Sequence, residues 1–159
     1  MKKITLLAAV FVAFTMNAQV TIWEESFEDY EDFDIEILGA YQWDLDESLT
    51  YGALNFDFEN EEYVGTAIVF NSSVMTDADP NDPQDRTIWN ARTGEKGLYM
   101  IAATSLLNDD YIITPRIDLT SVNAAQFSFW AKSLTDAYGL ERFHVLLSTT
   151  SSNYFDFTV

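Results

Sequence analysis

Strict alternation of apolar and polar residues in two neighbouring segments is the sequence feature that most constrains the fold. Residues 125–131 have apolar side chains at every odd position, and residues 141–148 repeat the pattern with Phe143, Val145 and Leu147. Successive side chains of a strand point to opposite faces, so this period predicts two strands. The polar residues between them end in Gly139. The pattern therefore predicts an antiparallel hairpin over residues 125–148.

Four further segments favour strands, at residues 20–27, 66–70, 97–102 and 111–114. Turn-forming residues separate them, and no helical periodicity follows residue 20. Strands without intervening helices predict an all-β fold, a sandwich or a barrel. Residues 154–159 stop within an apolar, strand-like pattern. Because such a strand would expose an unpaired edge, we expect the domain to be truncated at the C-terminus.

The first 18 residues have the layout of a secretory signal peptide. Lys2 and Lys3 precede an apolar run at residues 4–14, and Ala18 is the small residue before the expected cleavage point. The run is too short to span a bilayer; the alternative is a buried N-terminal helix. We expect a signal peptide at 1–18, a mature domain at 19–159 and a secreted or cell-surface location. The chain has no cysteine, which excludes disulfides and a lipid-modified cysteine.

Charge is the feature that excludes most partners. The chain has 26 acidic and 8 basic residues, a formal net charge of −18. This composition argues against nucleic-acid binding and against docking on anionic lipid. No basic residue lies between Lys3 and Arg86, where 19 of the acids fall. Either bound cations, calcium above all, or a hydrated salt-adapted surface offsets the repulsion.

A known family shares several strings of this sequence. The most specific are residues 108–119 (NDDYIITPRIDL), 127–133 (FSFWAKS) and 138–150 (YGLERFHVLLSTT), with weaker likeness at 23–28 and 43–46. The chain resembles the cleaved adhesin family, also called choice-of-anchor J domains, found in surface proteins of Bacteroidetes and in the adhesin regions of gingipains. The resemblance covers nearly all of 21–159. It implies a jelly-roll antiparallel β-sandwich with structural calcium, in a secreted protein with further domains.

The sequence departs from the family pattern in three places. Glu47-Ser48 stands where members often have a glycine in an Asp-x-Asp loop, and Arg92-Thr93 stands where they often have His or Ser before a turn glycine. Family domains also continue into further strands that end in an acidic pair. If those acids complete a metal site, this chain carries only part of it.

Calcium takes six to eight oxygen ligands, mostly carboxylates and backbone carbonyls. The best candidates follow the first predicted strand, occupy the next loop or begin the strand at 111–114. Glu141 shares a strand row with Phe143 and is expected to point inward or to the rim, where a bare carboxylate is costly. The alternative is that these acids form only a solvated surface. The candidate ligands are Glu28, Asp29, Asp44, Asp46, Asp109, Asp110 and Glu141.

Catalysis has no specific signature in this sequence. A glycosidase needs two carboxylates at a set separation, and with 26 acids some pair is always present. His144 is the only histidine and no nucleophile motif surrounds it. Asp77, Asp79 and Asn81 have the opening spacing of an EF-hand, but Ile88 stands where the closing glutamate belongs, which favours an irregular loop. We therefore expect no enzyme activity.

Aromatic residues are the remaining indication of binding. Trp130 lies on the polar row of its predicted strand, and Tyr138 lies in the adjoining loop. Exposed aromatics stack on sugars or anchor proteins; the alternative is that Trp130 packs under a loop. We expect a secreted, calcium-stabilised, non-catalytic module that contacts a glycan or protein surface ligand. The alternatives are an accessory N-terminal domain of a secreted hydrolase (peptidase or glycosidase) whose catalytic part is not in this chain, and a structural spacer.

Overall fold

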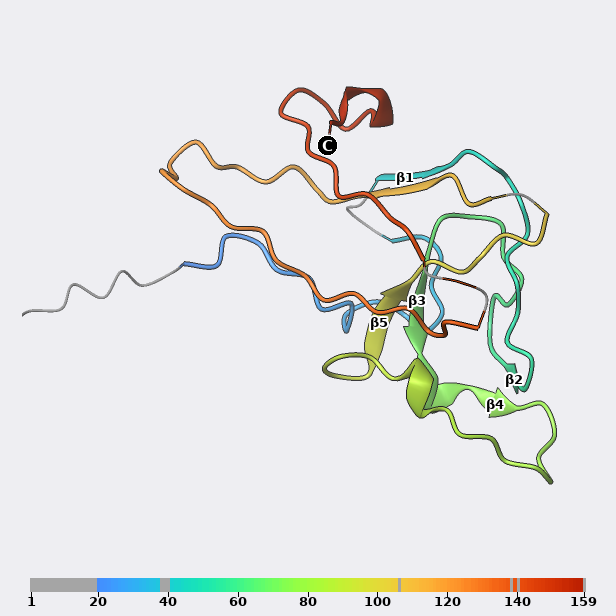
Figure 1. The fold of residues 1–159 in the computed structure, drawn as a ribbon. Coiled ribbons are helices and arrows are strands. Elements are labelled where there is room, and N and C mark those ends of the chain that lie inside the picture. Colours follow the sequence, from blue (N-terminus) through green and yellow to red (C-terminus); the bar gives the residue numbers. More distant parts are fainter. Residues whose placement is uncertain (1–19, 38–40, 106, 138, 140, 159) are drawn as a thin grey trace, which may run out of the picture.

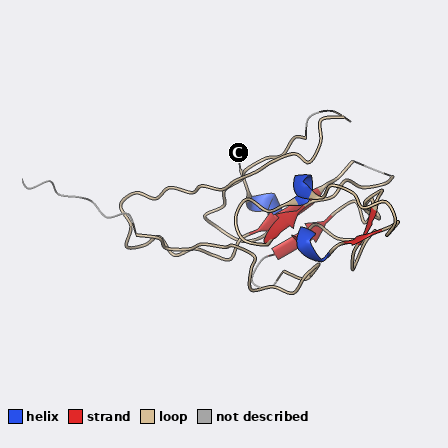
Figure 2. Ribbon diagram, turned by 90° about the horizontal axis from the view of Figure 1, so that it is seen from below, coloured by secondary structure: helices blue, strands red, loops and turns tan. Residues whose placement is uncertain are grey.

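A computed structural model describes residues 20–37, 41–105, 107–137, 139 and 141–158. The expected signal peptide lies outside these residues. Within them, short strands and single turns of 3-10 helix are joined by long loops (Figures 1 and 2), and no helix is long and apolar enough to cross a membrane. The elements are β1 (Tyr41–Asp44), β2 (Phe56–Asp57), β3 (Ile68–Asn71), η1 (Ser72–Val74), β4 (Thr76–Asp77), η2 (Thr87–Trp89), β5 (Lys96–Tyr99), β6 (Asp110–Ile113) and η3 (Tyr154–Asp156).

The strands pair into three two-stranded antiparallel sheets. β1 pairs with β6, β2 with β4, and β3 with β5. The all-β prediction is therefore confirmed. Three sheets of this size do not define a sandwich, so the jelly-roll arrangement stays a prediction.

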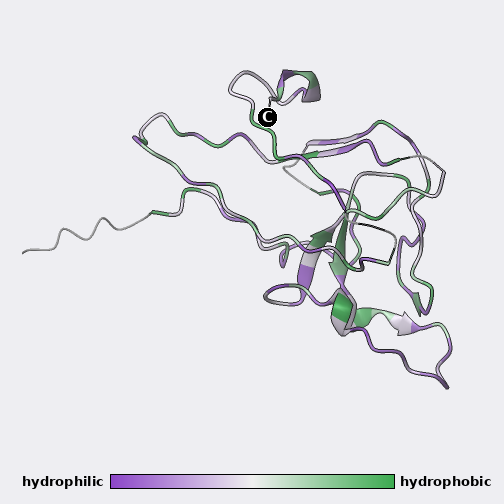
Figure 3. Ribbon diagram, in the orientation of Figure 1, coloured by the Kyte–Doolittle hydropathy of each residue, from purple (hydrophilic) through white to green (hydrophobic). Residues whose placement is uncertain are grey.

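β3 is the centre of the core because its side chains are covered on both faces. Ile68 and Phe70 join one apolar cluster, which includes Phe33, Phe56 and Met75. Val69, with Ala67 just before the strand, belongs to a second cluster on the other face. A run of β-branched and aromatic residues suits such a doubly covered strand. Figure 3 shows β3 as a hydrophobic strand.

Three of the predicted strands are confirmed, with shifted ends. β3, β5 and β6 correspond to the segments predicted at 66–70, 97–102 and 111–114. The described residues of segment 20–27 form no strand. Residues 33 and 34, a few positions further along the chain, bond to β3 instead. Phe33 N–H donates to the Val69 carbonyl (2.8 Å), and Val69 N–H donates to the Asp34 carbonyl (2.8 Å).

The predicted hairpin over 125–148 is wrong for the residues that the structure describes. Neither arm is a strand, and Figure 1 draws both as loops. The rings of Phe129 and Phe143 still meet, with centroids 6.1 Å apart, and these residues are equidistant in sequence from Asp136. Both rings are at least half exposed. Alternation makes a strand only where a partner pairs its backbone along its length and a core covers one face. Among the described residues of the two arms, Leu147 alone forms a bridge, with Thr158, and the apolar row at Phe143, Val145 and Leu147 stays exposed.

Candidate functional site

The pairing of β1 with β6 places two acids directly opposite each other. Asp44, the last residue of β1, is the register partner of Asp110, the first residue of β6. The ladder is extended by one bond, from Leu45 N–H to the Asp109 carbonyl (3.1 Å). Like charges directly opposite on an antiparallel pair are destabilising. A positive charge or a proton at this end of the sheet would relieve the repulsion.

A third carboxylate comes from the turn after β1. Asp46 accepts bonds from the N–H groups of Ser48 (3.0 Å) and Asp109 (2.9 Å), while Asp44 accepts one from Glu47 N–H (2.7 Å). Glu47 takes the left-handed conformation that favours glycine, at φ 49°. The turn thus holds Asp46 against the start of β6. One carboxylate oxygen from each of Asp44, Asp46 and Asp110 lies within 4.8 Å of the other two.

Asp110 is the most perturbed member of this acidic cluster. Asn108 donates to its Oδ2 (3.0 Å), but its buried Oδ1 has no hydrogen-bond partner among the described residues. Burial, reinforced by the charges of Asp46 and Asp44, raises the pKa of Asp110 to about 6. Tyr63, which is 6% exposed, is likewise buried. Burial is the main cause that raises the pKa of Tyr63, and the charges of Asp110 and Asp44 add to it.

The cluster of Asp44, Asp46 and Asp110 has the chemistry of a hard-cation site. The ion pairs of the described chain are Arg86–Asp77 (3.0 Å) and Lys96–Asp32 (3.3 Å), so no basic side chain neutralises the cluster. Calcium binds oxygen at 2.3–2.6 Å, so two ligands of one ion are at most about 5 Å apart. The spacing of the three oxygens fits this limit, and the free Oδ1 of Asp110 is a ligand atom without other use.

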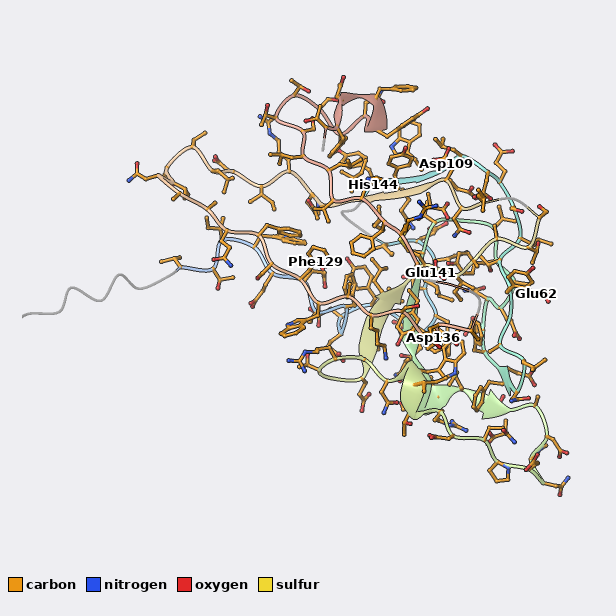
Figure 4. All side chains as sticks on the ribbon, viewed as in Figure 1. Glu62, Asp109, Phe129, Asp136, Glu141 and His144 are labelled. Carbon is orange, nitrogen blue, oxygen red and sulfur yellow. The ribbon has the colours of Figure 1, made fainter. Side chains whose placement is uncertain are left out.

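Four of the seven predicted ligands contribute no carboxylate to this cluster. Glu28 instead accepts bonds from the N–H groups of Glu95 and Lys96 (both 3.0 Å). Asp29 borders a shallow acidic hollow with Glu24, Glu25 and Ser26. Asp109 contributes its N–H to Asp46. Glu141 was expected to point inward or to the rim; it is exposed, which rules out the inward position, and it lies apart from Asp109 in Figure 4.

The two predicted ligand-binding aromatics have different outcomes. Trp130 is 76% exposed, and the guanidinium carbon of Arg92 lies 3.9 Å from its ring centroid. Tyr138 lies outside the described residues. A third aromatic group packs on the β1–β6 sheet, where Tyr154 of η3 contacts Trp43 and Tyr111 with centroids 5.3 and 5.1 Å apart.

Three residues near these sites were not predicted from the sequence. Asn108 orients Asp110 and also bonds to the Ile101 carbonyl (2.9 Å) and the Ala103 N–H (2.6 Å). It is adjacent to the Asp109-Asp110 pair, and that adjacency was the only local signal. Tyr63 has no signal near it in the sequence. Arg92 was visible only as a departure from the family pattern before Gly94.

Comparison with known proteins identifies one family. The sequence model of the Cleaved Adhesin Domain matches residues 61–159, which include Asp110 and Trp130 but not Asp44 or Asp46. No curated protein matches the chain. No solved structure matches it either.

Proposed function

The chain belongs to the cleaved adhesin domain family, and from this premise we propose that it is a secreted, non-catalytic adhesion module stabilised by calcium. The family is an adhesin-type module of extracellular or surface proteins. The finer part of the proposal is that residues 1–18 direct export, with cleavage near Ala18, and that the mature domain contacts a glycan or protein on a surface. The layout of the N-terminus and the exposed Trp130 support it.

The register of β1 against β6 is the observation that carries the calcium proposal. Asp44, Asp46 and Asp110 converge without a basic partner in the described chain, and Asp110 Oδ1 is buried and free. A bound cation would offset the repulsion across the end of the ladder. Backbone carbonyls and water would complete the shell of six to eight oxygens. When bound, calcium supplies positive charge and no reaction chemistry.

Thermal unfolding with and without calcium tests the proposed site. A ligand that binds only the folded state raises the unfolding midpoint. We expect calcium to raise the midpoint of the unaltered protein well above its value in chelator or in magnesium at equal ionic strength. Asp44→Asn should abolish most of this rise.

Glu28→Gln is the matched control for that experiment. It also removes one negative charge, but Glu28 bonds to backbone N–H groups away from the cluster. We expect the calcium-dependent rise to persist in this variant. An equal loss of the rise in both variants would contradict the assignment of Asp44, and no rise in the unaltered protein would remove the calcium proposal.

Attachment to immobilised glycans and to host-surface proteins tests the adhesion proposal. The full chain should bind saturably to at least one such surface. Trp130→Ala should reduce this binding because it removes an exposed aromatic contact. An absence of saturable binding to every surface would contradict the adhesion proposal.

A further inference from the structure

Arg92 is an arginine without an acidic partner among the described residues of a strongly acidic chain. It makes no ion pair and no hydrogen bond with the described residues, although the protein carries 26 acids. Its guanidinium instead lies over Trp130 at 3.9 Å from the ring centroid. A cation over an indole is attracted by the ring, while the N–H edges of the guanidinium stay free.

The loop that carries Arg92 is held at several points. Lys132 Nζ donates to the carbonyls of Ile88 (2.7 Å) and Asn90 (2.6 Å), and Tyr99 donates to the Trp89 carbonyl (2.5 Å). On the far side of Arg92, Glu28 binds the backbone at the start of β5. The backbone on both sides of Arg92 is therefore held in place, and the Lys132 ammonium adds a second positive charge at the same loop.

We propose that Arg92 and Trp130 form a binding site for a glycan that carries an isolated carboxylate, such as one uronic acid among neutral sugars. This inference rests on the proposed adhesion function and names its ligand class. The carboxylate pairs edge-on with the guanidinium through two parallel N–H···O bonds. A neighbouring sugar stacks its C–H face on the indole.

The exposure of Trp130 shows that the indole can receive that sugar. Arg92 covers one ring face, so an exposed fraction of 76% requires the other face to be largely open. Shape and charge limit the ligand further. The two hollows at residues 24–29 and 116–120 are open and are not lined by Arg92 or Trp130. The pair therefore stands on an exposed surface, whereas peptide anchors bind in enclosed pockets. A densely charged polyanion is repelled by the net charge of −18, but a single carboxylate at a local pair of cations is not.

Titration with two matched disaccharides tests this site. One is glucuronic acid linked to glucose, and the other is glucose linked to glucose through the same bond, so that they differ only in the carboxylate. We expect the unaltered full chain to bind the acidic disaccharide at least tenfold more tightly. Arg92→Gln should weaken binding of the acidic disaccharide at least tenfold and remove the preference. Trp130→Ala should weaken both ligands.

Arg116→Gln is the charge-matched control, because it removes an exposed arginine elsewhere in the sequence. Arg116→Gln should keep the preference for the acidic over the neutral disaccharide within twofold of the unaltered value. The unfolding midpoint of each variant verifies that it is folded. Equal binding of both disaccharides, or an unchanged preference in Arg92→Gln, overturns the inference. Tighter binding of an aspartate-containing peptide also overturns it, in favour of a protein ligand. If neither disaccharide binds while the chain still attaches to a surface, this inference fails and the adhesion proposal stands.

Discussion

Asp110 is the residue at which burial and charge most directly oppose folding. In the folded protein its pKa is raised to about 6 from an ordinary value of 3.8. The folded state therefore holds a proton that the unfolded chain releases between these values. The stability that this proton provides is fully present below pH 3.8 and is lost as the pH rises through about 6.

We expect Asp110→Asn to remove this pH dependence. Thermal midpoints are measured in calcium-free buffer from pH 3.5 to 7. As the pH rises over this range, the midpoint of the unaltered protein should decrease relative to that of the variant. Above pH 6 the variant should be the more stable of the two, because asparagine cannot ionise. Parallel curves over this range would contradict the account of Asp110.

Glu47 is a second residue where the local conformation disfavours the side chain present. Its φ of 49° lies in the left-handed region, which costs a residue with a Cβ about 1–2 kcal/mol. Glu47→Gly removes this strain, but glycine is also more flexible in the unfolded chain, which offsets part of the gain. We therefore expect a net rise of about 1 kcal/mol in the free energy of unfolding, measured by urea titration. Glu59→Gly, at an exposed position without a positive φ, should lower it. A loss of stability in Glu47→Gly would contradict the assigned turn.

At the scale of elements, one carboxylate joins the segment at residues 28–32 to the start of β5 by hydrogen bonds. Glu28 accepts bonds from two successive N–H groups, at Glu95 and Lys96. Gly94 precedes them at φ 68°, and a Cβ added there would overlap Glu28 Oε1. Lys96, the first residue of β5, also binds this segment through its side chain. Its Nζ contacts the Tyr30 carbonyl and forms an ion pair with Asp32.

We expect Gly94→Ala to destabilise the protein by about 1–3 kcal/mol, from the left-handed conformation and from the displaced carboxylate. In the Glu28→Ala background there is no carboxylate to displace, so Gly94→Ala should lower the free energy of unfolding by less than it does in the unaltered protein. Urea unfolding of the four proteins in this cycle measures the coupling. Strictly additive losses would show that Glu28 does not depend on the Gly94 turn.

At the scale of the whole molecule, self-repulsion is the dominant electrostatic feature. Nineteen acids lie before Arg86 without a basic residue after Lys3. The same region contributes Phe33, Phe56 and Phe70 to the core, so it folds in spite of its charge. Each of the two ion pairs of the described chain joins an acid of this region to a basic residue at or beyond Arg86.

Salt should therefore stabilise the protein even without calcium. Raising sodium chloride to about 1 M shortens the screening length to ~3 Å and weakens the repulsion between surface acids. We expect the thermal midpoint in chelator to rise by several degrees, and to rise equally in Asp44→Asn, since the effect is spread over many acids. A midpoint that does not change or that falls with salt would contradict this account.

The sequence alone predicted the family, the all-β class and three of the strands. These predictions depend on local strings, such as the apolar run at β3 and the residues around Asp110. It also selected Asp44, Asp46 and Asp110 as ligands, but together with Glu28, Asp29, Asp109 and Glu141. Nothing local distinguishes the acids that converge from those that do not.

Only the tertiary structure decided which residues meet. The antiparallel register sets Asp44 against Asp110, and the loop before β5 brings Gly94 to Glu28 and Arg92 to Trp130. The tertiary structure also left the alternating segments at 125–148 without a strand in the described chain, apart from the single bridge between Leu147 and Thr158. The physical reason is that alternation specifies the faces of a strand, whereas its partner depends on which distant surface covers one of those faces. Local pattern therefore set the kind of structure, and long-range packing set the sites.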